Sequence, residues 1–382
     1  MQKTSGITPE TRLFFDFIKT AGIIGIFTTH FYDVYIGAGG ITAMLNLGIW
    51  KYLFMNKSSL SSYAGAIFQT FLAFGAIGVD LFIIASGFGI YYSYLSKKTG
   101  WLSFYKKRFL RLLPLYYIAL LVEFLIKAYI SQNNFYPSAE GIKVLAYHFL
   151  LIQTFSKSYL YYGVYYFIAV IFQLYIIFPV LTKIVQSKIW RLPFFIFSLL
   201  LTPLLNKMFG MTGINFTGVL ITDYLPYFLF GMLIADSMFN DRKLHKIVFD
   251  IRLSFLSMIS LIVTIYLVSY VFHYNKYFWM LIAFITFLAM PFVFSLIKKL
   301  KIKPMIDPVS YSAYSFYLLH IPVIQLGLSA ILREDIGDYR YWLFLGTCFF
   351  LITAIVSYFA QKGYDRILKP FLSDLISLKT TN

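Results

Sequence analysis

Long apolar runs recur along almost the whole chain, and short stretches that hold most of the charged residues separate them. A helix needs about 20 mainly apolar residues to span a bilayer. Ten segments are long and apolar enough: residues 13–33, 68–92, 110–130, 162–182, 193–210, 219–237, 254–273, 277–297, 308–331 and 341–360. The pattern therefore predicts an all-α, polytopic integral membrane protein with about ten transmembrane helices.

One further apolar segment, residues 144–155, is too short to cross the bilayer. We expect it to lie in the interface or to re-enter the membrane. The first apolar run lacks a small-residue cleavage pattern, so we expect it to remain as a helix and not to be removed as a signal peptide. No stretch is typical of a soluble domain, and residues 1–382 are expected to form a single membrane-embedded domain.

The loops between these segments alternate in positive charge. Lysines and arginines concentrate in every second loop and in the C-terminal tail, at residues 97–111, 183–191, 242–252, 298–303 and 362–379. Basic residues near the ends of transmembrane helices gather on the cytoplasmic side of a membrane. An even number of helices then places both termini in the cytoplasm.

Composition supports a membrane protein and narrows the chemistry. Apolar residues make up 59% of the chain and charged residues 13%, whereas a soluble domain carries about 25% charged residues. A net charge of +17 is common in nucleic-acid binders, but membrane topology disperses the basic residues here, so we expect no nucleic-acid partner. Cys348 is the only cysteine, which excludes an internal disulfide and a cysteine-ligated zinc site, and no metal is expected.

The first predicted helix carries Asp16, Lys19 and His30. Ionisable groups inside a membrane are costly, so each is a functional candidate. Eleven residues come within about 20° of three full helical turns, which places Lys19 and His30 on one face, about 16 Å apart. Two interpretations stay open. Asp16 and Lys19 form an ion pair beside a packed histidine, or a neutral imidazole serves as the general base for a hydroxyl nucleophile.

Asp80 lies in the second predicted helix, and a carboxylate in the middle of a membrane needs a partner. Lys19 and His30 are the candidate partners. Ser86, Gly87 and Gly89 follow on the same helix, and small residues let another helix approach closely. Helix packing is the simpler role for the two glycines. Ser86 is also a candidate site residue.

Arg108 and Arg111 begin the third predicted helix, three residues apart and on one face at the cytoplasmic edge. They form part of the positive-inside signal. Two guanidinium groups on one face also suit a phosphorylated ligand that arrives from the cytosol.

Two aromatic patterns also have alternative interpretations. His320 follows tyrosines at every third position, which indicates either a packed polar stripe or a further site residue. The tyrosines of residues 158–167 form either an interfacial belt or a surface on which sugar rings stack.

Four motifs in this order resemble the membrane-bound acyltransferase 3 family, over nearly the whole chain. The first is a basic residue, ten further residues and a histidine, here Lys19 and His30. The others are Gly78–Phe82 with Ser86–Phe88, the pair Arg108 and Arg111 with Pro114, and a Tyr-Leu-Leu-His sequence that ends at His320. The usual basic residue of the first motif is arginine, so Lys19 keeps the charge but lacks the planar guanidinium fork.

The resemblance implies a bacterial O-acyltransferase in the cytoplasmic membrane. Its donor would be a coenzyme A thioester, most commonly cytosolic acetyl-CoA, and its acceptor a hydroxyl of an extracytoplasmic or lipid-linked glycan. His30 would act as general base or be transiently acylated, and Lys19 and Asp80 would orient the site or stabilise developing charge. Arg108 and Arg111 would bind the coenzyme A phosphates. The partners would be membrane lipid, the glycan and the thioester.

An exporter or flippase of a surface polysaccharide or lipid-linked glycan is the alternative. The region around Gln173 resembles the branch associated with surface-polysaccharide modification, and export has been proposed for part of that branch. Ten helices, polar stripes and aromatic outer loops suit either activity. Only an acyltransferase needs coenzyme A.

Overall fold

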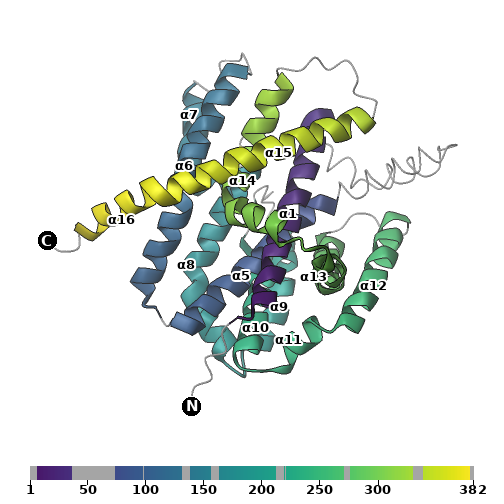
Figure 1. Cartoon of the computed structure of the whole chain (residues 1–382). Coiled ribbons are helices and arrows are strands. Elements are labelled where there is room, and N and C mark those ends of the chain that lie inside the picture. The colour runs from purple at the N-terminus through teal and green to yellow at the C-terminus, as the bar shows by residue number, and fades with distance from the viewer. Residues whose placement is uncertain are drawn as a thin grey trace. The chain divides into compact units, whose positions relative to one another are not determined.

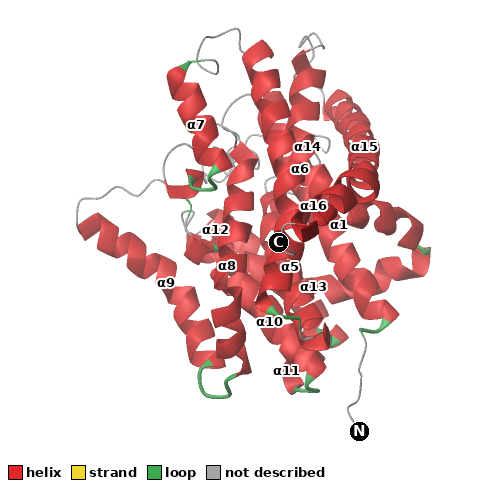
Figure 2. Ribbon diagram, turned by 90° about the vertical axis from the view of Figure 1, so that its left-hand side faces the viewer, coloured by secondary structure: helices red, strands yellow, loops and turns green. Residues whose placement is uncertain are grey.

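The computed structural model of the chain describes residues 7–36, 74–97, 99–130, 138–155, 163–211, 219, 221–270, 276–329 and 339–378. Nearly all of these residues are helical, and no strand occurs among them (Figure 2). The predicted all-α class is therefore confirmed.

A helix lies at each of the ten predicted segments. In chain order these helices are α1 (Pro9–Ile36), α5 (Gly78–Lys97), α6 (Trp101–Ile130), α8 (Tyr166–Gln186), α9 (Arg191–Met211), α10 (Leu225–Phe239), α12 (Ile251–Tyr270), α13 (Lys276–Ile297), α14 (Lys303–Ser329) and α15 (Tyr339–Gly363) (Figure 1). Residues 68–73, 162, 220, 271–273 and 330–331 of the predicted segments lie outside the described residues, as do residues 158–162 of the tyrosine-rich stretch.

Five helical stretches of the described residues are long and apolar enough to cross a membrane: Gly75–Lys97, Trp101–Tyr129, Tyr166–Gln186, Phe278–Leu300 and Leu343–Asp374. These stretches confirm a membrane protein. Three shorter apolar helical stretches accompany them, at Arg191–Leu205, Leu225–Phe239 and Ile251–Ile265.

Several short elements lie between or after the long helices. α7 (Ala139–Phe149) and the 3-10 turn η2 (Gln153–Phe155) occupy the segment predicted to be too short to span. Further 3-10 turns are η1 (Phe74–Ile77), η4 (Gly163–Tyr165), η5 (Ile221–Asp223) and η6 (Lys298–Leu300). The short helix α11 (Lys243–Val248), the π-helical turn η7 (Tyr364–Leu368) and α16 (Lys369–Leu378) were not predicted.

The chain divides into two compact units that are interleaved in the sequence. The first unit comprises Met1–Ala85 and Asn240–Val356, and the second comprises Ser86–Phe239 and Ser357–Asn382. Helices α5 and α15 contribute residues to both units. Each unit therefore combines an early and a late part of the chain.

In the first unit, α1 packs along α14 and α12 packs along α13 (Figure 1). Buried phenylalanines fill the space between these helices. The ring of Phe14 meets the rings of Phe249 and Phe294 edge to face, with centroids 5.0 and 5.6 Å apart. Further along α1, Phe27 stacks on Phe31 with centroids 5.9 Å apart. This apolar stripe of α1 lies against its neighbours and so determines where the polar residues of the same helix project.

Glycines allow α1 to cross η1 and the start of α5 with almost no space between the backbones. A Cβ atom added to Gly75 would lie 2.3 Å from the carbonyl oxygen of Gly25, and one added to Gly78 would lie 2.2 Å from that of Gly22. Real Cβ atoms do not approach oxygen atoms so closely, so only glycine fits at these positions. This crossing was not predicted from the sequence.

In the second unit, aromatic rings surround the fully buried Phe178 of α8. Phe104 of α6 stacks on it at 4.8 Å, and the rings of Tyr91 and Tyr94 of α5 lie edge to face at 6.4 and 5.9 Å. Gly87 permits the close approach that was expected of it, because a Cβ there would lie 2.1 Å from the carbonyl oxygen of Phe228.

Tyrosine hydroxyls of α6 hold the end of α7 in the second unit. Tyr116 donates to the carbonyl of His148 at 2.9 Å, and Tyr117 donates to that of Phe149 at 3.0 Å. These two carbonyls lie in the last turn of α7, where no intrahelical partner remains. Elsewhere on α6, the carbonyl of Leu110 accepts a hydrogen bond from the hydroxyl of Tyr364. This bond attaches η7 to α6 at a residue that lies between Arg108 and Arg111 in the sequence.

Candidate functional site

The two histidines predicted as site residues in the first unit are in direct contact. His30 Nδ1 of α1 lies 2.9 Å from His320 Nε2 of α14. The imidazole rings are nearly parallel, with centroids 5.1 Å apart and an interplanar angle of 26°. His320 is completely buried, whereas His30 is half-buried. The sequence named both residues without predicting that they meet.

The main chain of α14 holds the second ring of this pair. His320 Nδ1 lies 2.6 Å from the carbonyl oxygen of Tyr317, one turn earlier on the same helix. Pro322 follows two residues later inside the helix and has no N–H to donate to the carbonyl of Leu318, four residues before it.

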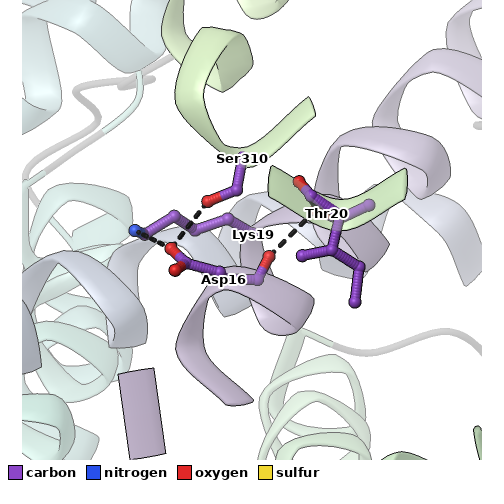
Figure 3. A network of polar contacts seen from close by, with 5 residues as sticks. Asp16, Lys19, Thr20 and Ser310 are labelled. Carbon is purple, nitrogen blue, oxygen red and sulfur yellow. Dashed lines mark hydrogen bonds and ion pairs between the residues drawn. The ribbon is translucent and has the colours of Figure 1, made fainter. Parts of the chain in front are cut away.

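A separate polar network joins an earlier turn of α1 to α14 (Figure 3). Asp16 Oδ1 accepts hydrogen bonds from Lys19 Nζ at 2.9 Å and from the Ser310 hydroxyl at 2.7 Å. The hydroxyl of Thr20 donates to the backbone carbonyl of Asp16 at 2.9 Å. The ion pair of Asp16 and Lys19, which belonged to one of the two interpretations of the sequence, is present, and the contact with Ser310 was not predicted.

Lys19 and His30 therefore belong to two different networks. Eleven residues of helix separate them by about 16 Å along the axis. Lys19 pairs with Asp16, and His30 pairs with His320. The structure does not bring the lysine to the imidazole.

Asp80 is buried in the first unit and does not pair with either of its candidate partners. Its Oδ2 accepts a hydrogen bond from the indole N–H of Trp279, a residue of α13, at 3.0 Å. The expected partnership with Lys19 or His30 was therefore wrong. The glycine crossing explains why, since Gly78 faces α1 and two further residues turn the helix by about 200°. Asp80 consequently points away from α1.

Arg108 and Arg111 lie three residues apart on α6 in the second unit, in different surroundings. The guanidinium carbon of Arg108 lies 5.5 Å from the ring centroid of Phe104 and 6.0 Å from that of Tyr175. Arg111 is exposed. A stacked guanidinium is held in place and keeps its edge for hydrogen bonding. One arginine is thus anchored and the other is accessible.

Ser86 is half-buried where α5 enters the second unit. Its neighbour Gly87 packs on the backbone of Phe228. Within the part of the chain that the structure describes, a Cβ at Gly89 would meet nothing within 4 Å, so no close approach there supports the expected packing role. Ser86 belongs to the second unit, whereas the histidine pair belongs to the first.

An ion pair inside α6 was not predicted from the sequence. Glu123 is 1% exposed, and its Oε1 lies 3.2 Å from Lys127 Nζ. A carboxylate four residues before a lysine in an apolar run was the signal that could have revealed it. Over the described ranges, no group of three His, Cys, Asp or Glu side chains is placed to hold a metal ion.

Comparison with protein families identifies the chain. The family model of the acyltransferase domain matches residues 12–360, which include every candidate site residue described above. The chain belongs to the acyltransferase 3 family. No curated protein and no solved structure matches it.

Membership of the acyltransferase 3 family gives the chain an acyltransferase function. Acyl transfer to a hydroxyl requires a group that accepts the hydroxyl proton and a site that holds the acyl donor. A half-buried imidazole suits the first task. An anchored guanidinium and an accessible one, both on α6, suit a donor that carries phosphates.

Proposed function

We propose that this acyltransferase 3 protein transfers an acetyl group from cytosolic acetyl-CoA to a hydroxyl of an extracytoplasmic or lipid-linked glycan. It resides in the bacterial cytoplasmic membrane and crosses it ten times, with both termini in the cytoplasm. The alternation of basic loops along the sequence supports this topology. The helix found at each of the ten predicted segments is consistent with it.

The observation that carries the proposal is the half-buried His30 in contact with His320, within a chain of this family. The acceptor hydroxyl transfers its proton to His30 while its oxygen bonds to the thioester carbonyl carbon. The carbon–sulfur bond then breaks, and the proton passes from the imidazole to the leaving thiolate, which leaves as coenzyme A. A transiently acylated imidazole is the second route to the same products.

Arg108 and Arg111 bind the phosphates of coenzyme A in this proposal. Arginine donates two parallel hydrogen bonds to a phosphate, a geometry that lysine cannot reproduce. The stacking of Arg108 on Phe104 and Tyr175 supports a role as an anchored donor, and the exposure of Arg111 supports contact with an arriving ligand.

Lys19 and Asp80 act in positioning, because both connect helices of the first unit. Lys19 holds Asp16, which Ser310 also contacts, and so helps to connect α1 to α14. Asp80 connects α5 to α13 through Trp279. The helices connected by Lys19 and Asp16 are the same two that carry His30 and His320.

The test is transfer of label from radioactive acetyl-CoA in membrane vesicles that contain the parent protein or His30→Gln. Loss of a general base lowers the rate by about 10²–10⁴-fold, so label should enter lipid-linked or wall glycan only with the parent. Thr28→Ala is the matched control, since among the described residues the Thr28 hydroxyl donates only to the carbonyl of Gly25 on its own helix. Protein levels are compared by immunoblot.

Equal labelling by His30→Gln and the parent would refute the role of His30. If the parent transfers neither acetyl nor succinyl groups, the acyltransferase proposal fails for these donors. The export of a labelled lipid-linked glycan across the same vesicles would then be measured, because an exporter moves glycan without coenzyme A.

A further inference from the structure

We propose that His320 is a positioning residue that holds His30 in the tautomer protonated on Nδ1, so that His30 Nε2 takes the proton of the acceptor hydroxyl. This inference rests on the proposed acyl transfer. It specifies which nitrogen of His30 accepts the proton, and it assigns His320 the role of fixing the His30 tautomer. Both conclusions follow from the order of donors and acceptors in a line of contacts from Tyr317 through His320 to His30.

The line begins at a carbonyl group. The oxygen of Tyr317 lies 2.6 Å from His320 Nδ1 and can only accept a hydrogen bond. His320 Nδ1 must therefore carry the hydrogen. A neutral imidazole has one N–H, so its other nitrogen, His320 Nε2, presents a lone pair.

The second contact transmits this assignment to α1. His30 Nδ1 lies 2.9 Å from His320 Nε2, and a hydrogen bond at that distance needs one donor. Since His320 Nε2 is the acceptor, His30 Nδ1 is the donor. His30 Nε2 is left with the lone pair, and this nitrogen is the basic end of the line.

Packing keeps the two rings in this arrangement. One turn before His30, the buried ring of Phe27 meets that of Phe316 edge to face, with centroids 5.9 Å apart. Phe31, the next residue after His30, is also completely buried. Buried neighbours restrict the rotation of an imidazole, so the hydrogen bond costs little additional ordering.

The arrangement suits a base that gains and loses one proton in each turnover. When His30 Nε2 accepts the hydroxyl proton, Nδ1 keeps its bond to His320, and the carbonyl dipole of Tyr317 lies beyond. His320 stays neutral throughout. Two protonated rings would place two N–H donors against each other at the 2.9 Å contact, so the pair accepts only one proton.

The tautomer can be measured without any acyl donor. Imidazole ¹⁵N shifts distinguish protonated from unprotonated ring nitrogens, and solid-state NMR applies to the full-length protein in bilayers. Thr29–His30 is the only Thr–His pair among the five histidines. Threonine labelled with ¹³C at the carbonyl, combined with ¹⁵N,¹³C-histidine, therefore assigns His30 selectively. We expect protonated Nδ1 and unprotonated Nε2, and the reverse result would overturn the proposal.

Kinetics of His320 variants test the consequence for transfer. His320→Gln keeps an amide oxygen within reach of His30 Nδ1, whereas His320→Leu keeps volume and removes the acceptor. Loss of the hydrogen-bond partner behind a metal-ligating histidine typically costs about 10–100-fold, and we take the same range for this pair. We expect His320→Leu to lower kcat by about that factor with an unchanged KM for acetyl-CoA, and His320→Gln to recover most of the loss. Similar kcat values for the parent and His320→Leu would overturn the proposal.

His148→Leu is the matched control for the removal of a buried histidine. His148 is completely buried, and its Nδ1 lies 2.9 Å from the carbonyl oxygen of Val144 on its own helix, but it belongs to the second unit. The His148→Leu variant should leave the His30 resonances unchanged, whereas His320→Leu should shift them.

The two proposals fail in distinguishable ways. Protonation of His30 on Nδ1 in a parent that transfers no acyl group would refute the acyltransferase proposal, and with it the catalytic use of the pair. An active parent with His30 protonated on Nε2 would refute only the role of His320.

Discussion

Arg108 and Arg111 occupy equivalent positions in sequence terms but differ in the structure, and this difference can be measured. Arg108 stacks on two aromatic rings, and Arg111 is exposed. Replacing either by lysine keeps the charge and loses the planar fork. We expect each substitution to raise the KM for acetyl-CoA by about 10-fold, since a charge-assisted hydrogen bond contributes about 1.5–3 kcal/mol.

Arg108→Lys should also lower thermal stability, because its stacking on Phe104 and Tyr175 is lost, whereas Arg111→Lys should not. Lys107→Ala is the control, since it removes an exposed charge from the same turn. Unchanged KM values in both arginine variants would contradict donor binding at this pair and favour the exporter.

His148 predicts a pH dependence of stability. Burial lowers the pKa of His148 to about 4, against 6.5 for an unperturbed histidine, and the Lys127 charge lowers it further while the Val144 hydrogen bond opposes the shift. Below pH 6.5 the unfolded chain binds a proton that the folded protein does not bind until about pH 4. Stability is therefore retained above pH 6.5 and falls between these values.

The measurement is the Tm of the protein in detergent between pH 7.5 and 4.5, for the parent and for His148→Asn. The asparagine keeps a donor for the Val144 carbonyl and does not titrate. We expect a smaller acid-induced fall in Tm for this variant. Parallel curves of Tm against pH for the two proteins would show that His148 does not contribute to the loss of stability in acid.

At the residue scale, the sequence predicted the candidate site residues more successfully than it predicted the contacts between them. The helical spacing of Lys19 and His30 placed them on one face, and the Asp16–Lys19 ion pair followed from a spacing of three. The contact of His30 with His320 spans 290 positions, and no periodicity within one helix predicts it. The bond from Trp279 to Asp80 was missed for the same reason.

At the scale of helices, the glycine crossing gives a sharp test. Gly25→Ala would place a Cβ 2.7 Å from the carbonyl oxygen of Gly75, and Gly75→Ala would place one 2.3 Å from that of Gly25. The backbones would have to separate, so both variants should lower Tm and the amount of folded protein. Overpacking of this kind costs about 1–3 kcal/mol.

Gly89→Ala is the matched control, because a Cβ there would meet none of the described residues within 4 Å. Alanine in an unhindered helical position typically adds about 0.4–1 kcal/mol of stability. If Gly25→Ala, Gly75→Ala and Gly89→Ala lowered Tm equally, the loss of stability would come from replacing any glycine and not from the helix crossing.

Helices were the part of the fold that the sequence predicted best. A run of apolar residues is a local signal, and a helix lies at each of the ten runs. Packing between helices depends on residues that are far apart in the sequence. The residues around Gly22 and Gly25 therefore do not indicate that these glycines pack against Gly75 and Gly78. α16 is too short and too polar to resemble a spanning helix, which is why it was not predicted.

At the scale of the whole molecule, the interleaving of the two units was not predicted, because it depends on which helices pack together. The first unit combines Met1–Ala85 with Asn240–Val356 and contains the histidine pair. The second unit contains both candidate phosphate-binding arginines. A single domain over the whole chain stays a prediction, whereas membrane residence follows from the apolar helices and from the family.

The number of membrane crossings decides on which side of the membrane each loop lies. Helices α9, α10 and α12 each have only a shorter apolar stretch, and of these α9 and α10 follow each other directly in the chain. If both cross, Lys188 before α9 and Lys243 after α10 lie on the same, cytoplasmic side. If only one crosses, the two residues lie on opposite sides, and so do the two termini.

Single cysteines in a Cys348→Ser background measure this parity, because the chain has no other cysteine. A membrane-impermeant thiol reagent applied to intact cells should label Ser138→Cys, between α6 and α7, but neither Lys188→Cys nor Lys243→Cys. Both lysine positions should react in inverted vesicles, which shows that each thiol is reactive. Labelling of Lys243→Cys in intact cells would establish that one of the two helices does not cross. The even count of helices, and with it the cytoplasmic location of both termini, would then be wrong.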